Sequence, residues 1–191
     1  MMEFVYAYAY FILYAFLGWA CEDLYCGIPT KKFINRGFFY GPYCPIYGVG
    51  ALLVLYPLLF VKDYPILVFV LGVIITSALE YITSWVMEIL FKTRWWDYSE
   101  RFMNINGRVC LLNSTLFGIM SIVVIYIIHP IIQDIVMDIP FTALMSFLSA
   151  FTIGFGIDCV FTVLALLRRK QVFQKVQVQM EAFKTDFEAE S

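Results

Sequence analysis

Five apolar runs separated by short polar segments dominate the pattern of this 191-residue chain. They cover about residues 4–25, 43–61, 66–91, 110–132 and 141–167. A membrane-spanning helix needs about 20 apolar residues to cross a hydrocarbon core of about 30 Å. Each run is close to that length or longer, so the pattern predicts an all-α, polytopic membrane bundle of five transmembrane helices.

The segment between the first and second runs is apolar but does not fit a regular helix. Residues 37–48 contain three glycines and two prolines, which oppose a continuous helix, yet most of their other side chains are aromatic. Irregular backbone at membrane depth is tolerated only where protein or a water-filled cavity satisfies its N–H and C=O groups. We therefore expect a folded-in loop on the cytoplasmic side that lines a pocket, with Asn35 and Arg36 as its polar side chains.

The composition supports a membrane protein and excludes several other classes. The chain is 62% hydrophobic and 15% charged, whereas a soluble domain is about half apolar and a quarter charged. No basic aromatic patch indicates a nucleic-acid partner. The five cysteines form no C-x-x-C pair and there is a single histidine, so we expect no metal site and no cofactor.

The basic residues predict the orientation in the membrane. If the N-terminus is outside, twelve of the 13 Lys and Arg residues fall on the cytoplasmic side and only Lys62 lies outside. We therefore predict an N-out, C-in, multi-pass protein of the bacterial cytoplasmic membrane. Residues 1–170 would form the membrane domain and 171–191 a cytoplasmic amphipathic tail. The tail could lie on the bilayer, cross a neighbouring helix or pair with another subunit.

Polar residues recur along one face of the third run, at offsets of three and four: Thr76, Ser77, Glu80, Thr83, Ser84 and Glu88. A carboxylate inside a membrane normally pairs with a cation or lines a water-filled cavity. Arg36 and Arg108 are the candidate partners, because the predicted topology places them at the same end. A purely structural Glu–Arg clamp between helices remains an alternative.

These residues lead us to expect one polar cavity that faces the cytosol. Its predicted members are Glu22, Asn35, Arg36, Glu80, Glu88, Trp96, Asp97, Asn106 and Arg108. Three glutamates against two arginines leave one acid unmatched, and the deepest of them, Glu80, would bind a proton or a cationic group. Two further expectations are a turn at Asn106-Gly107 and an interfacial position for His129.

Several short motifs along residues 10–132 resemble a known family. They are Gly18-Trp19 with Glu22, Asn35-Arg36-Gly37-Phe38, Gly41-Pro42, Pro45-Ile46-Tyr47-Gly48, Glu80-Tyr81, Met87-Glu88, Trp95-Trp96-Asp97-Tyr98 and Asn106-Gly107-Arg108. Together they resemble the bacterial ABC-transporter permease family of the CmpB type, which is similar to a small vertebrate transmembrane family. The resemblance implies an integral membrane protein with a permease label, but it implies no mechanism, no substrate and no catalytic residues.

Three functions fit these observations. The favoured one is a transporter permease or solute-binding membrane component with a cytosol-facing polar pocket. The chain has no G-x-x-x-x-G-K-[ST] phosphate loop, so an ATPase would be a separate partner. A membrane-embedded enzyme acting on a lipid or amphiphile is a less favoured alternative, with Glu22, Glu80 or Glu88 as acid or base and the arginines holding an anionic headgroup. The third is a non-catalytic accessory or scaffold subunit, and a homo-oligomer stays open.

The predicted topology can be tested with an impermeant thiol reagent on intact cells. We expect a cysteine placed at Asp134 to react and one placed at Arg101 to be protected, because they lie on opposite sides in the N-out arrangement. The reverse pattern would show that the orientation is wrong.

Overall fold

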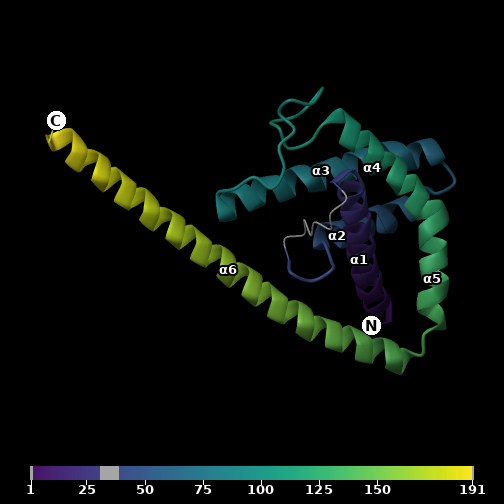
Figure 1. Ribbon diagram of the computed structural model, residues 1–191. Helices are drawn as coiled ribbons and strands as arrows, with labels where there is room; N and C mark the ends of the chain where they lie inside the picture. The colour runs from purple at the N-terminus through teal and green to yellow at the C-terminus, as the bar shows by residue number, and fades with distance from the viewer. Residues whose placement is uncertain (1, 31–38, 191) are drawn as a thin grey trace.

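A computed structural model describes residues 2–30 and 39–190, with side chains placed at 2–24 and 39–168, and every regular element in these ranges is a helix (Figure 1). The α-helices are α1 (Met2–Thr30), α2 (Pro45–Leu58), α3 (Pro65–Phe91), α4 (Leu111–Val123), α5 (His129–Asp138) and α6 (Phe141–Glu190). A 3₁₀ turn, Leu59–Val61, extends α2, and a π-helical turn, Val124–Ile128, joins α4 to α5.

Four helical segments are long and apolar enough to cross a membrane: Met2–Leu24, Pro65–Phe91, Leu111–Asp138 and Phe141–Arg168. The shorter apolar helix Pro45–Val61 is the fifth. The prediction of a polytopic helical membrane bundle of about five helices is therefore confirmed.

The fourth span is longer than the sequence pattern suggested. Pro130 interrupts the pattern, but it stands in the first turn of α5, where the missing N–H of proline is tolerated. The helix continues to Asp138, so His129 lies well inside the span. Only 5% of His129 is exposed, and its Nδ1 lies 3.4 Å from the hydroxyl of Tyr14. The expectation of an interfacial histidine is therefore wrong.

α6 runs without a break from the fifth span to the end of the described chain. Its 50 residues correspond to a length of about 75 Å, and its C-terminal half projects away from the bundle (Figure 1). The backbone of the predicted tail is therefore helical, and it continues the transmembrane helix. The domain boundary at residue 170 stays a prediction, and it falls inside this helix.

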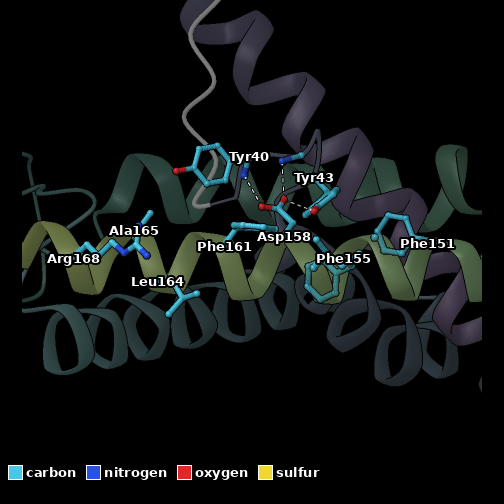
Figure 2. A pocket seen from close by; sticks show the side chains of 12 residues that line it. Tyr40, Tyr43, Phe151, Phe155, Asp158, Phe161, Leu164, Ala165 and Arg168 are labelled. Carbon is cyan, nitrogen blue, oxygen red and sulfur yellow. Dashed lines mark hydrogen bonds between the residues drawn. The ribbon is translucent and has the colours of Figure 1, made fainter.

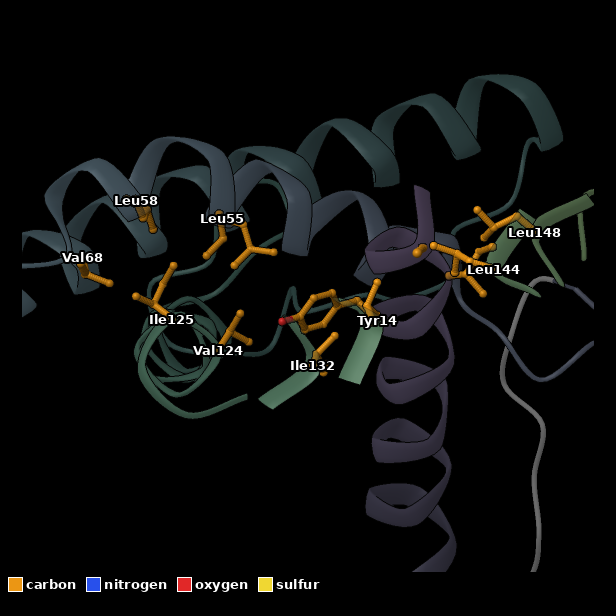
Figure 3. Packing of buried hydrophobic residues seen from close by; sticks show 13 residues of the cluster. Tyr14, Leu55, Leu58, Val68, Val124, Ile125, Ile132, Leu144 and Leu148 are labelled. Carbon is orange, nitrogen blue, oxygen red and sulfur yellow. The ribbon is translucent and has the colours of Figure 1, made fainter. Parts of the chain in front are cut away.

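Helices α1 and α2 pack along each other, as do α3 and α4, and contacts between α2 and α3 join the two pairs. Buried apolar residues from α1, α2, α3, the fourth span and the start of α6 form the core, which includes Tyr14, Leu58, Val68, Ile125 and Leu148 (Figure 3). The hydroxyls of Tyr8 and Thr152 lie 2.9 Å apart and tie the beginning of α1 to α6. The N-terminus and the start of α6 lie near the same end of the molecule (Figure 1). This is expected, because four crossings separate them and α6 is the fifth.

Two glycines of α2 offer a matched test of this packing. A Cβ at Gly48 would stand 2.5 Å from the backbone oxygen of Phe11, whereas one at Gly50 would meet only the side chain of Leu79, at 3.3 Å. We expect Gly48→Ala to destabilise the protein by about 2 kcal/mol, because the α1 backbone must shift. Gly50→Ala should be neutral or slightly stabilising. Thermal unfolding in detergent measures both, and equal melting temperatures would contradict the close α1–α2 contact.

Candidate functional site

The Asn106-Gly107 turn positions the first element of the candidate site. Asn106 and Gly107 have φ values of +53° and +69°, and the N–H of Arg108 donates to the carbonyl oxygen of Ile105 at 3.0 Å. Positive φ at both central residues defines the type I′ turn that Asn-Gly favours. The predicted turn is therefore confirmed, and it presents Arg108 to the C-terminal part of α3.

Arg108 is buried and is bound by the polar face of α3. Its Nη2 donates to Oε2 of Glu88 at 2.6 Å, and its Nη1 donates to Oγ of Ser84 at 3.2 Å. The guanidinium also lies 5.6 Å from the centre of the Tyr81 ring, within the range of a cation–π interaction. One arginine thus joins the segment between α3 and α4 to α3 itself.

A second arginine binds the same carboxylate oxygen from a more exposed position. Nε of Arg94 lies 3.2 Å from Oε2 of Glu88, and its Nη1 lies 3.9 Å from Oδ1 of Asp97. The hydroxyl and N–H of Ser99 both donate to Asp97 and lower the pKa of this carboxyl. Two cations and two carboxylates therefore form a cluster whose formal charges cancel.

The indole and amide that the sequence singled out complete this arrangement. Nε1 of Trp96 donates to the carbonyl oxygen of Arg108 at 2.9 Å, and Nδ2 of Asn106 donates to the hydroxyl of Tyr81 at 2.8 Å. The structure thus brings together five residues of the expected cavity: Glu88, Trp96, Asp97, Asn106 and Arg108. We refer to Glu88, Arg94, Asp97 and Arg108 as the ion cluster.

Glu80 lies two helical turns further into the span and has no cationic partner among the described residues. It is only 6% exposed, and its Oε1 accepts a hydrogen bond from the Tyr98 hydroxyl at 3.2 Å. Its Oε2 is buried with no hydrogen-bond partner. The side chain of Asn113 from α4 lies within reach of both Glu80 and Tyr98. Burial, followed by the charge of Glu80, raises the pKa of Tyr98.

Glu22 lies on α1, and the structure connects it to Glu80 only indirectly. The Tyr47 hydroxyl donates to Oε2 of Glu22 at 3.1 Å, and Tyr47 interacts electrostatically with Tyr98. Asn35 and Arg36 fall outside the described residues, so their place in the cavity stays a prediction.

The sequence analysis did not anticipate the partner of the folded-in loop. Tyr40 and Gly41 donate their N–H groups to the two carboxylate oxygens of Asp158, at 3.2 and 2.8 Å. The Tyr43 hydroxyl donates to the same carboxylate (Figure 2), and so does the Thr162 hydroxyl, one turn further along α6. A mid-helix carboxylate thus anchors the described part of the loop on α6, and the only sequence signal was the four-residue spacing from Asp158 to Thr162.

Another buried acid that the sequence analysis left out of the cavity is Asp23 on α1. It is 7% exposed, and neither of its carboxylate oxygens has a hydrogen-bond partner among the described residues. Its negative charge also acts on the Cys44 thiol. In the part of the chain that the structure describes, no three His, Cys, Asp or Glu side chains lie close enough to hold a metal ion.

The apolar spans and the polar groups buried between them define a multi-pass integral membrane protein. The model of one protein family, described as "Putative ABC-transporter type IV" and named ABC_trans_CmpB, matches residues 9–163. The match covers most of the chain, so the protein belongs to this family, as the motifs suggested. No curated protein and no solved structure matches the chain.

The two arginines that share Glu88 allow a controlled test of the ion cluster. The Arg108 side chain is 10% exposed and that of Arg94 is 36% exposed. We expect Arg108→Ala to lower the melting temperature in detergent by about 5 °C or more, because it leaves Ser84 and Glu88 without their buried donor. Arg94→Ala should lower it by about 2 °C or less, as exposed ion pairs contribute little. Equal shifts would show that the depth of Arg108 contributes nothing to stability.

Proposed function

We propose that this protein is the membrane component of a transporter, and that Glu80 binds a proton or a small cationic solute on the cytoplasmic side. The observation that carries the proposal is the buried Glu80 carboxylate, whose Oε2 has no hydrogen-bond partner among the described residues. Membership of an ABC-transporter family supports the transport role.

The environment of Glu80 favours a binding role over a structural clamp. An unpaired charge inside a membrane costs roughly 3 to more than 10 kcal/mol, so a structural carboxylate is expected to have both oxygens paired. Tyr98 donates to Oε1 of Glu80 and the Asn113 side chain lies within reach, but Oε2 has no hydrogen-bond partner among the described residues. A proton or a cation on the open oxygen would remove the cost of burying the charge.

The ion cluster supports controlled access to this carboxylate. Glu88 and Glu80 are about 12 Å apart along α3, and Ser84, which binds Arg108, stands one turn from each. A solute entering from the cytoplasmic side would have to displace Arg108 and the segment that carries it. Because the formal charges of the cluster cancel, it holds the entrance closed without attracting or repelling a cation over long distances.

Transport driven by ATP would require a second subunit. The 191 residues contain no G-x-x-x-x-G-K-[ST] loop to bind nucleotide phosphates. The cytoplasmic surfaces available to such a subunit are the segment between α3 and α4 and the extension of α6 (Figure 1). A coupling mechanism in which that subunit moves the ion cluster would link nucleotide hydrolysis to the opening of the Glu80 site.

Dicyclohexylcarbodiimide, a hydrophobic reagent that attacks protonated carboxylic acids, tests the proposal without a known substrate. We expect it to label Glu80 in the full-length protein, and to label it more as the pH falls, because only the protonated acid reacts. Peptide mapping by mass spectrometry locates the label. A bound cationic solute should protect the site, so protection by a panel of inorganic and organic cations would identify the solute class.

Substitution provides the control. Glu80→Gln should abolish the label while leaving the melting temperature within about 2 °C, because the amide oxygen still accepts the Tyr98 hydrogen bond. Glu22→Gln, at a half-buried acid on α1, should leave the Glu80 label unchanged. A Glu80 that stays unlabelled at every pH, and that no cation affects, would contradict the proposed function.

A further inference from the structure

A groove of about 990 Å³ lies along α6 beside the folded-in loop, and the transport proposal makes no use of it (Figure 2). Its lining runs along α6 from Phe151 to Arg168. At 1.5 Å per residue these two positions are about 25 Å apart along the helix. The groove therefore covers most of the membrane-spanning part of α6, which is among the least buried of the spans.

The one carboxylate in this groove is already saturated. Asp158 accepts hydrogen bonds from two backbone N–H groups and from two hydroxyls, which fills the roughly four acceptor positions of a carboxylate. It therefore holds the loop and offers no further position to a ligand. Much of the remaining wall is apolar, with Phe155, Phe161 and Leu164 lying between Phe151 and Arg168 (Figure 2).

The cytoplasmic end of the groove is cationic. Arg168 lines it, is exposed and makes no ion pair with any residue whose side chain the structure describes. From Arg168 to Ile157, another lining residue, α6 rises about 16 Å. This is close to half of the hydrocarbon core of about 30 Å, which is the depth of a single leaflet. The groove thus combines an apolar wall about one leaflet deep with a cation at its interfacial end. Its length matches an acyl chain, and its charge matches an anionic headgroup.

We propose that this groove binds one phospholipid with an anionic headgroup from the cytoplasmic leaflet. Arg168 binds the phosphate, for which the fork of a guanidinium is well suited, and an acyl chain lies along Leu164, Phe161 and Phe155. The arrangement also disfavours a second copy of this chain as the occupant. A parallel partner on the same face would bring two Arg168 side chains to the same depth, and like charges repel. The inference is independent of Glu80, which lies on α3.

Two glycines of α6 provide a matched pair of variants. A Cβ at Gly154 or at Gly156 would meet no atom within 4 Å, so a leucine fits at either position. Only Gly154 lines the groove. Native mass spectrometry of the full-length protein in detergent, with dioleoyl phosphatidylglycerol or dioleoyl phosphatidylcholine added, counts the bound lipids. We expect Gly154→Leu to weaken the binding of both lipids and Gly156→Leu to leave it unchanged.

Variants of Arg168 test the headgroup. We expect the wild-type protein to prefer phosphatidylglycerol, and Arg168→Ala to weaken that preference about fivefold, the contribution of one basic residue near an anionic headgroup. Arg168→Lys should retain most of the preference. Arg101→Ala, at an exposed arginine in the segment between α3 and α4, should retain all of it.

Three outcomes would overturn the proposal. Equal effects of the two glycine variants would assign the bound lipid to the general bilayer contact of α6. An unchanged phosphatidylglycerol preference in Arg168→Ala would remove the headgroup site. A dimer that Gly154→Leu dissociates without loss of lipid would assign the groove to a second copy of the chain.

Discussion

Inside a bilayer a peptide group finds no hydrogen-bond partner except those that the protein itself provides. Residues 39–44, directly before α2, form an irregular segment beside the middle of the fifth span, and the N–H groups of this segment must be satisfied there. Asp158 receives those of Tyr40 and Gly41, and the carbonyl oxygen of Ala15 receives that of Cys44, at 2.9 Å. Because these contacts satisfy the irregular backbone inside the bundle, α2 can begin at depth, and the apolar helix Pro45–Val61 crosses only the remaining thickness.

This irregular segment divides the bundle along the membrane normal. In α3, the buried residues of the half that follows Pro65 are Val68 and Gly72, whereas those of the other half are Glu80 and Ser84. Val68 joins the apolar core with Leu58 and Ile125 (Figure 3), and Gly72 lies against Ser121 of α4. Glu80 and Ser84 face the segment that carries Arg108. Close packing therefore fixes one half of the bundle, and polar contacts, which can exchange partners, hold the other.

The sequence predicted the features that depend on local pattern or on charge. Continuous apolar runs indicated the spans, Asn106-Gly107 indicated the turn, and the topology drawn from the basic residues placed Glu88 and Arg108 at the same end of the bundle. It missed the pairing of Asp158 with the loop, because 117 residues separate Asp158 from Gly41 and no local pattern encodes that contact. It also ended the fourth span too early, because Pro130 looks the same in sequence whether it ends a helix or opens a turn that continues one.

Glu80 on α3 and Asp158 on α6 have opposite surroundings, because Asp158 is fully hydrogen-bonded and Glu80 is not. Asp158 accepts four hydrogen bonds, so its protonation, or the binding of a solute to it, would break contacts that hold the loop. Glu80 has the Tyr98 hydroxyl on one oxygen and an open position on the other. In the transport role proposed above, a solute at Glu80 would add a partner to Oε2 without breaking a contact that holds the fold. In the proposed transport role, the difference in donors between Asp158 and Glu80 is therefore the reason to assign the exchange step to α3 and not to α6.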